Sequence, residues 1–481
     1  MAAGFLVAGD DRTLVERIVA HFDERIAHGT LRAGARLPSI RRLAQELGVS
    51  KFTVVEAYER LIAAGHIASR RGTGFFVCER AGRTPGTAPL AASAVRGASW
   101  ADAPRSSIDL VWLLRNMFRE LPAADMPGSG VLPPAFLDES LLTSAVRTLA
   151  RRNARALLDY GEPQGYLPLR QQLQIKLDEQ GIGAAPGQIV TTAGVTQALD
   201  LVAQCLLRPG DTVLVDDPSW FLMFGRFSLL GAQVIGVPRL PDGPDVEALR
   251  TLCERHRPKM FVTVSVVHNP TCTSMSAARA FQVLQLAQAY DMTIVEDDLL
   301  GDLHPGGFGH SCIRLAALDQ LDRVIYLGGF SKTLAANLRV GFIAASADRV
   351  RELTDLKMLV TLTSPEFGER LAHQVLSEGH YRRHLERLRS RLDSTRDETI
   401  RALEGLGLRL FAQPVAGMYL WADAGVDTAA LAARMLDQGY LLAPGSLFLP
   451  DQRPSSWLRF NVATSRQPAM HRALAEALAH T

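Results

Sequence analysis

Residues 324–342 of the 481-residue chain read VIYLGGFSKTLAANLRVGF. An apolar β-type run opens this stretch, Ser331 and Lys332 follow it, and Arg339 comes seven residues after the lysine. A lysine amine can condense with an aldehyde, and an arginine can hold a phosphate group as a bidentate pair. A Ser-Lys pair in a loop is usually only a solvated lysine, so its meaning depends on the rest of the chain.

Composition is that of a globular protein with sizeable cores. The length fits two to four domains, and 47% of the residues are apolar. The net charge is +2, but residues 12–80 hold twelve Lys or Arg against seven Asp or Glu, which leaves −3 for the remainder. The positive charge is therefore concentrated near the N-terminus.

Cysteine usage and hydropathy indicate where the protein works. The five cysteines are scattered, with no C-x-x-C spacing, which argues against a disulfide framework or a zinc site. No apolar run approaches membrane-spanning length, and the first residues lack the features of a signal peptide. We therefore expect a cytoplasmic protein with no metal site and no membrane partner.

Three helices are expected near the N-terminus. The first covers residues 13–28, and the second covers residues 40–47 and is stopped by Gly48. Ser50 caps a third helix that ends near residue 64. The second and third helices, joined by a glycine-containing turn, form a helix-turn-helix pattern.

Two short apolar strands, residues 67–69 and 75–77, follow the helices around a tip that carries two arginines. This pattern predicts a β-hairpin, or wing. The stretch LPSIRRLAQELGVSKFTVVEAYERLIAAGHIASRRGTGFFV, residues 37–77, closely resembles the winged helix-turn-helix of GntR-type transcription regulators. We place this domain at residues 12–79, and the resemblance implies double-stranded operator DNA as a partner.

The first turn of the third helix is the part that can reach base edges in a major groove, and wing arginines can reach phosphates or the minor groove. Arg41 resembles a DNA-contacting arginine of the family. The expected DNA contacts are Arg41, Ser50, Lys51, Thr53, Arg70 and Arg71. The alternative is that some of these arginines, like Arg42 and Arg60, only solvate the surface.

Residues 80–108 are rich in Ala, Gly, Pro and Ser and are expected to form a flexible linker. A coil of this length spans roughly 30 Å, enough for the small domain to reach a neighbouring subunit. The rest, residues 109–481, is expected to be one α/β unit. Its large part covers about 165–370, and a smaller C-terminal α+β part covers about 371–481.

Continuous apolar strands alternate with helical segments beyond the linker. The strand-like runs are residues 188–192, 212–215, 261–266, 293–295, 324–327 and 340–344. Such alternation predicts an α/β fold with a mainly parallel sheet covered on both faces. Ligands of these sheets bind at the carboxyl ends of the strands.

Successive strand ends carry side chains that suit pyridoxal phosphate (PLP). A glycine turn can bind phosphate, an indole can stack on the ring, an amide can donate to the phenolic oxygen, and a carboxylate can keep the pyridine nitrogen protonated. In chain order these residues are Gly194, Val195 and Thr196, then Trp220, Asn269, Asp297 and finally Lys332. Each of these residues, taken alone, could be an ordinary turn, surface or core residue. The complete series is hard to produce by accident.

This order resembles the PLP-dependent aminotransferases of fold type I over roughly residues 109–481. With its GntR-like N-terminus, the whole chain resembles MocR-type transcription regulators. The resemblance implies PLP bound as an internal aldimine to Lys332, with Asp297 at the pyridinium nitrogen and Asn269 at the ring oxygen.

Further roles follow from the same resemblance. Arg339 and the turn at Gly194 would bind phosphate, and Trp220 would stack on the ring. Tyr160 matches a tyrosine that reaches the phosphate of the partner subunit, which implies a homodimer. Arg459 matches the arginine that grips a substrate carboxylate.

The chain departs from the family pattern at four positions. Leu299 and Leu300 stand where many members carry a tyrosine that bonds the ring oxygen. Gly329 replaces a common threonine or serine, and Cys272 replaces a common glycine. The losses weaken hydrogen bonding to the cofactor, so they argue against efficient transamination more than against binding.

Three functions therefore compete. The leading hypothesis is a DNA-binding regulator whose aminotransferase-like domain binds PLP and senses PLP or an amino compound such as an amino acid or amine. The second is an active aminotransferase with an appended DNA-binding domain. The third is a scaffold that binds no PLP.

Overall fold

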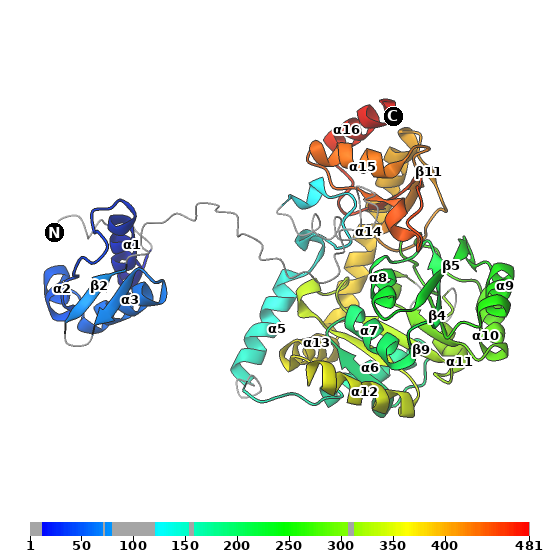
Figure 1. Cartoon of the computed structure of the whole chain (residues 1–481), viewed down its shortest axis with the longest axis horizontal. Coiled ribbons are helices and arrows are strands. Elements are labelled where there is room, and N and C mark those ends of the chain that lie inside the picture. The colour runs from blue at the N-terminus through cyan, green and yellow to red at the C-terminus, as the bar shows by residue number, and fades with distance from the viewer. Residues whose placement is uncertain (1–11, 71–72, 79–120, 153–157, 306–311, 481) are drawn as a thin grey trace. The chain divides into compact units, whose positions relative to one another are not determined.

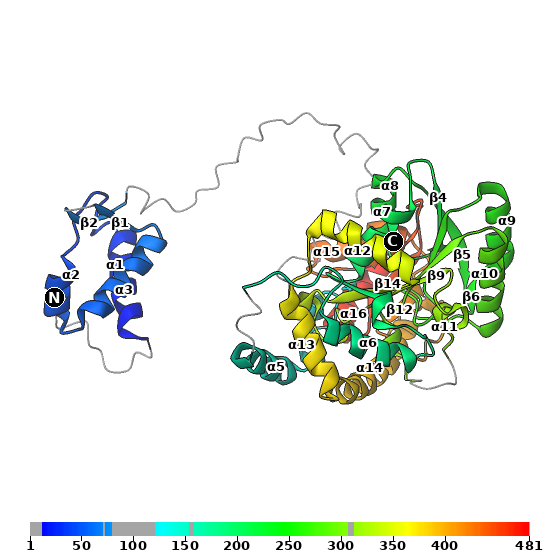
Figure 2. The ribbon, with the colours of Figure 1, turned by 90° about the horizontal axis from the view of Figure 1, so that it is seen from below.

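The computed structural model describes residues 12–70, 73–78, 121–152, 158–305 and 312–480. The chain divides into two compact units, residues 1–101 and 102–481 (Figures 1 and 2). The expected linker at residues 80–108, and Arg71 in the wing, lie outside the described residues. The domain boundaries drawn from the sequence stay predictions.

The N-terminal unit is a winged helix-turn-helix, as the sequence predicts. Its elements are α1 (Leu14–Ala27), α2 (Ile40–Leu47), α3 (Lys51–Ala63) and the antiparallel strands β1 (Ile67–Arg70) and β2 (Gly74–Val77). Ser50 caps α3 by accepting a hydrogen bond from the Thr53 amide at 3.0 Å. Gly48 ends α2 with a φ of 65°, a left-handed conformation that favours glycine. One face of each helix then packs into a small core that includes Ile18, Phe22, Val54 and Leu61.

The second unit is built on an eight-stranded sheet in the order β3-β10-β9-β8-β7-β4-β5-β6. Its strands are β3 (Ile189–Thr192), β4 (Thr212–Asp217), β5 (Gln233–Leu240), β6 (Gly243–Pro244), β7 (Met260–Thr263), β8 (Thr293–Asp297), β9 (Val324–Gly329) and β10 (Gly341–Ala344). Strands β5, β4, β7, β8 and β9 pair in parallel, whereas β10 is antiparallel to both neighbours. This confirms the mainly parallel sheet predicted from the sequence.

Helices cover both faces of this sheet (Figure 1). They are α6 (Leu167–Asp178), α7 (Val195–Leu206), α8 (Leu222–Leu229), α9 (Val246–His256), α10 (Ala277–Ala289), α11 (Leu315–Asp319), α12 (Ala347–Thr361) and α13 (Glu366–Ser377). In β4, Val213 and Val215 pack into the core that contains α7, whereas Leu214 enters the core that contains α9. Because successive strand residues point to opposite faces, these strands are apolar throughout.

The C-terminal part is the smaller α+β layer expected from the sequence. A four-stranded antiparallel sheet, in the order β11-β12-β14-β13, is flanked by helices. Its elements are β11 (Arg409–Leu410), β12 (Tyr419–Asp423), β13 (Ala443–Pro444), β14 (Trp457–Asn461), α14 (His380–Gly405), α15 (Thr428–Asp437) and α16 (Pro468–Ala479). Leu420 and Leu458 share one apolar core with the large sheet, which fixes the two sheets against each other. No helix within the described ranges is both long and apolar enough to cross a bilayer.

Candidate functional site

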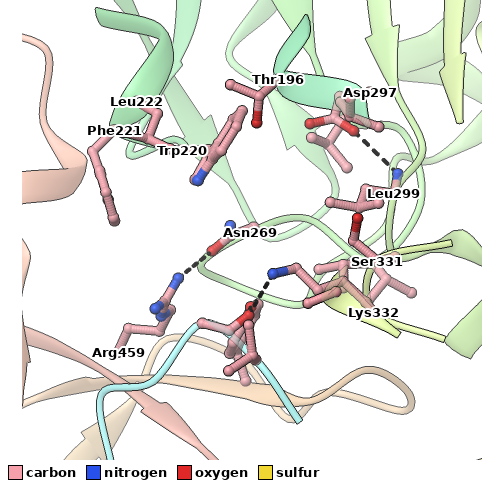
Figure 3. Close-up of a pocket in the computed structure, with 18 of the residues that line it drawn as sticks. Thr196, Trp220, Phe221, Leu222, Asn269, Asp297, Leu299, Ser331, Lys332 and Arg459 are labelled. Carbon is pink, nitrogen blue, oxygen red and sulfur yellow. Dashed lines mark hydrogen bonds between the residues drawn. The ribbon is translucent and has the colours of Figure 1, made fainter. Parts of the chain in front are cut away.

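A cavity of about 520 Å³ opens where the parallel strands of the large sheet end. It lies between that sheet and the C-terminal sheet (Figure 3). Predicted site residues that line it are Val195, Thr196, Trp220, Asn269, Asp297, Lys332, Arg339 and Arg459. Residues far apart in the sequence therefore surround one space of the size that a cofactor needs.

Lys332 follows β9 and points into the cavity (Figure 3). Its Nζ donates a hydrogen bond to the Gly130 carbonyl oxygen at 2.6 Å. Burial, together with the positive charges of Arg459 and Arg339, lowers the pKa of Lys332 to about 8, whereas the Asp297 charge opposes this shift. A lysine with a lowered pKa carries more of the neutral amine that acts as a nucleophile.

Side chains of α14 hold the loop that follows Lys332. The Thr333 hydroxyl lies 2.7 Å from the Tyr381 hydroxyl, and the His384 Nε2 lies 2.6 Å from the Thr333 carbonyl oxygen. All three side chains are buried. Two contacts on the adjacent residue therefore limit how far the lysine backbone can move.

The three consecutive acids at the end of β8 separate into three environments. Glu296 turns away from the cavity and accepts hydrogen bonds at 2.8 Å from two backbone amides at the start of α11. Asp298 pairs with Arg314 at 2.6 Å. Asp297 alone among them lines the cavity, where it accepts from the Leu299 amide at 3.1 Å. Burial is the main cause that raises the pKa of Asp297 to about 6; the Asp298 charge acts in the same direction, and the Leu299 hydrogen bond opposes it.

One end of the cavity is suited to an anion. Gly194, with a φ of 86°, is the N-cap of α7, and no side chain caps this helix. A Cβ on Gly194 would lie 2.6 Å from Nη2 of Arg339, whose guanidinium donates to the Ala193 carbonyl oxygen at 2.8 Å. Open amides of a helix N-terminus beside a guanidinium fit a phosphate group.

Arg459, on β14, approaches from the other side (Figure 3). Its side chain is only 2% exposed, and its guanidinium lies 4.4 Å from the centre of the Tyr419 ring. It donates to the Asn269 Oδ1 at 3.1 Å and to the Gly128 carbonyl oxygen at 2.9 Å. Among the described residues it has no carboxylate partner, and its Nε has no hydrogen-bond partner. Because a buried cation with only neutral partners is costly, a ligand carboxylate fits here.

Sequence reasoning missed a segment that closes the cavity, which we call the strap, residues 126–131. The Gly130 carbonyl oxygen accepts from Lys332 and also from the Tyr419 hydroxyl at 2.9 Å. A Cβ on Gly128 would lie 2.4 Å from the Ala443 backbone nitrogen, so only glycine fits there. The available signal was a Gly-Ser-Gly run flanked by prolines, which resembles an ordinary loop.

The four departures from the family pattern have visible causes or consequences. Leu299 and Leu300 line the cavity with apolar surface. A Cβ on Gly329 would lie 3.2 Å from Cγ2 of Val195, so a larger side chain there would be crowded. Cys272 is buried with a φ of 52°, a conformation that costs a residue with a Cβ and explains a preference for glycine.

Tyr160 does not join the cavity. Its side chain is 82% exposed, and the nearby Leu158 is 83% exposed. The predicted role of Tyr160, contact with the phosphate of a second subunit, stays a prediction.

The expected DNA contacts differ in their partners. Arg41 and Lys51 are exposed, and neither has an ion-pair partner in the described part of the chain. In contrast, Arg42 and Arg60 each pair with a glutamate on their own helix, at 2.7 Å and 2.8 Å. The structure thus separates two cations that are available to a ligand from two that are already paired.

The other expected DNA contacts have local partners. The Ser50 and Thr53 hydroxyls lie 2.8 Å apart as part of the α3 cap. The Arg70 guanidinium lies 4.9 Å from the centre of the Phe76 ring. These contacts hold the side chains near the first turn of α3 and along the wing, and their roles toward DNA stay predictions.

Comparisons with known proteins agree with both units. Residues 133–478 match the family described as "Aminotransferase class I and II". Residues 14–77 match the family described as "Bacterial regulatory proteins, gntR family". The two matches follow the division seen in the fold.

Relatives and solved structures extend these matches. The HTH-type transcriptional regulator TauR of Rhodobacter capsulatus is 30% identical over 458 residues, covering 93% of this chain and 92% of TauR. The kynurenine aminotransferase of Pyrococcus horikoshii, solved with PMP, is 26% identical with a TM-score of 0.71, covering 79% of this chain and 96% of that one. LysN, an α-aminoadipate aminotransferase of Thermus thermophilus solved with N-(5'-phosphopyridoxyl)-L-leucine, is 27% identical with a TM-score of 0.70, covering 79% and 98%.

The aminotransferase match covers most of the chain, and the regulator match covers nearly all of it. The family expected from the sequence is thereby confirmed. The chain belongs to the aminotransferase class I and II family, among the MocR-like transcription regulators in which a GntR-type winged helix-turn-helix precedes the aminotransferase-like domain.

Proposed function

We propose that the chain is a transcription regulator that binds operator DNA through its winged helix-turn-helix and binds PLP covalently at Lys332. Its aminotransferase-like domain senses PLP, an amino compound, or both. One observation carries the proposal: Lys332, Asp297 and Arg459 face a single cavity as a nucleophilic amine, a carboxylate and a guanidinium that has no carboxylate partner among the described residues. The cofactors in the related solved structures support the choice of PLP.

The cavity residues fit PLP group by group. The α7 N-terminus at Gly194 and the Arg339 guanidinium suit the phosphate. The Asp297 carboxylate suits the pyridine nitrogen, which it would keep protonated. Because Oδ1 of Asn269 accepts from Arg459, its Nδ2 remains to donate to the ring oxygen. PLP supplies an electron sink when bound. Trp220 offers an aromatic face for stacking.

An amino compound that fits this cavity carries a carboxylate. Arg459 presents a planar fork with neutral partners, and a carboxylate can take both of its outer nitrogens. The amine of the same compound would lie toward Lys332. Amino acids therefore match the cavity better than simple amines.

Regulation requires that ligand and DNA binding affect each other. A ligand can shift the protein only through different affinities for two states, and the coupling must be reciprocal. We expect PLP or the amino compound to change operator affinity, and saturating operator to change ligand affinity by the same factor. Fluorescence anisotropy with labelled operator, paired with ligand titrations, measures both. If neither affinity responds, the regulatory part of the proposal fails, while DNA binding stands.

An active aminotransferase is the second candidate. It is favoured by the same three groups in one cavity and by the enzymes among the structural relatives. A screen of amino donors against 2-oxo acids separates the candidates, because multiple turnovers with any pair would establish the enzyme.

A scaffold without PLP is the third candidate. A shift of the PLP absorbance band away from that of free PLP, absent in Lys332→Ala, eliminates it.

We also propose a homodimer in the cytoplasm, with the boundaries 12–79, 80–108 and 109–481 for the two domains and their linker. The exposed Tyr160 and Leu158, and Leu359 at 86% exposure, support a covered surface. All five cysteines are unpaired, as suits a reducing compartment.

Mixing Lys332→Ala with Tyr160→Ala chains tests the dimer. One intact site should reappear in mixed dimers, and tight PLP binding that never recovers contradicts a shared site.

A further inference from the structure

Phe52 is an exposed aromatic residue on the helix that the proposed function assigns to the major groove. It is the second residue of α3, and its side chain is 77% exposed. The other exposed large apolar side chains in the described part of this unit are Leu14 at 41% and Ile62 at 38%. The domain core includes Val54, Ala57, Tyr58 and Leu61 of the same helix but not Phe52. The fold therefore does not need this phenyl ring.

The surroundings of Phe52 indicate a nucleic-acid partner. Lys51 precedes it on α3, and Arg41 lies near the start of α2. Both cations are exposed without an ion-pair partner in the described part of the chain, which favours a polyanion over an apolar protein surface. The first turn of the second helix in a helix-turn-helix is the part that reaches base edges.

The chemistry of the groove then identifies the contact. A phenyl ring has no hydrogen-bonding group, so it cannot read the donors and acceptors of the bases. The C5-methyl group of thymine is the apolar group that the major groove presents. Cytosine carries only a hydrogen in place of that methyl group, so the ring would lose its apolar contact there.

We propose that Phe52 contacts the 5-methyl group of a thymine in each operator half-site and selects that base pair. The inference rests on the proposed DNA-binding function. It assigns a specificity role to a residue that sequence reasoning passed over in favour of its polar neighbours.

Deoxyuridine isolates this contact because it differs from thymidine only by the missing methyl group. Operator DNA is first selected from random fragments with the full-length protein. Each thymine is then replaced singly by deoxyuridine, and affinity is measured by anisotropy. At one position in each half-site we expect a loss of about fourfold, the effect of exposing one methyl group. The Phe52→Ala protein should bind thymine and deoxyuridine equally at that position.

Two controls separate a specific effect of Phe52 from a general effect on the domain. Ile62→Ala removes an exposed apolar side chain from the other end of α3 and should leave the deoxyuridine pattern unchanged. Thermal unfolding should show that Phe52→Ala stays folded. If selection yields no operator, the DNA-binding function itself fails. If operator is found but no thymine position distinguishes wild type from Phe52→Ala, the methyl contact is wrong. A uniform loss of affinity at every sequence also overturns it, because the ring would then pack on the backbone.

Discussion

The two units of this chain handle positive charge in opposite ways. The winged helix-turn-helix leaves Arg41 and Lys51 exposed, with no ion-pair partner among the described residues, whereas the cavity buries Arg459 and shields Lys332. Exposed cations keep their hydration and attract any polyanion over a distance that salt shortens. Buried cations have already lost much of their hydration, so they favour one small anion of matching geometry. The same charge therefore suits general attraction in one unit and selective recognition in the other.

Replacing Lys332 should abolish covalent PLP binding in the cavity. Lys332→Ala should leave the absorbance band of added PLP at the position of free PLP and retain no covalently bound PLP after gel filtration, because the cavity no longer offers an amine for the covalent bond. DNA binding without ligand should be unchanged, since the winged helix is a separate unit.

A second buried lysine offers an internal control for that result. Lys357 also has a pKa lowered to about 8 by burial, but its Nζ donates to the Thr191 carbonyl oxygen and it does not line the cavity. Borohydride reduction of the wild type followed by peptide mapping should place pyridoxyl on Lys332. Label on Lys357 would show that a lowered pKa suffices without the cavity.

The carboxylate-binding side should fail more selectively. Arg459→Ala should weaken a carboxylate-bearing amino acid by roughly 30-fold or more, the usual result of removing one partner of a buried charge pair. Arg459→Lys should recover little, because an ammonium cannot form the bidentate fork. Shifts of the PLP absorbance band report binding. The matched amines without a carboxylate should bind all three proteins alike, and a parallel loss for those amines would remove Arg459 from carboxylate recognition.

The DNA-binding side should respond in smaller steps that depend on salt. Arg41→Ala and Lys51→Ala should each cost about tenfold in operator affinity near 0.1 M salt, and a lost phosphate contact should lower the log–log salt slope by about 1. Arg42→Ala and Arg60→Ala are matched controls because glutamates already neutralise these arginines. Equal losses in all four variants would mean that pairing does not distinguish the cations.

The smallest effect concerns pH. Only the neutral Lys332 amine attacks an aldehyde, and its pKa is lowered to about 8. The rate of PLP attachment should therefore rise with pH below about 8 and level off above it, whereas an ordinary lysine would level off near 10.4. Because the Asp297 charge favours the protonated amine, Asp297→Asn should move the plateau to lower pH. Stopped-flow absorbance measures this, and a rate still rising at pH 9.5 would contradict the shift.

Sequence reasoning predicted much of the fold because local patterns specify it. Apolar runs such as those around Val213 and Ile325 are continuous because both faces of the sheet are covered. The carboxyl ends of parallel strands meet at one edge of the sheet. The sequence alone therefore predicts that Asn269, Asp297 and Lys332 lie close together.

The rest of the site depends on contacts between distant segments. Nothing local to Gly128 or Gly130 indicates that their carbonyls meet Arg459 and Lys332, because those partners lie at least 200 residues away. Phe52 escaped notice for a different reason. An apolar residue on an amphipathic helix is expected in the core, and only coordinates show that this one faces outward.

Two hydrogen bonds of the strap engage the groups that a ligand would use. The Gly128 carbonyl occupies the Arg459 guanidinium, and the Gly130 carbonyl occupies the Lys332 amine. An aldehyde that condenses with Lys332 must compete with the Gly130 carbonyl, whereas a carboxylate can share the Arg459 guanidinium with Gly128 through its remaining N–H groups. The hydrogen bond between Lys332 and Gly130 and the condensation of Lys332 with an aldehyde thus oppose each other. The strap also lies just downstream of the chain that leads back to the DNA-binding unit. Lys332 is therefore held by a segment that belongs to the first described stretch after the winged helix-turn-helix unit.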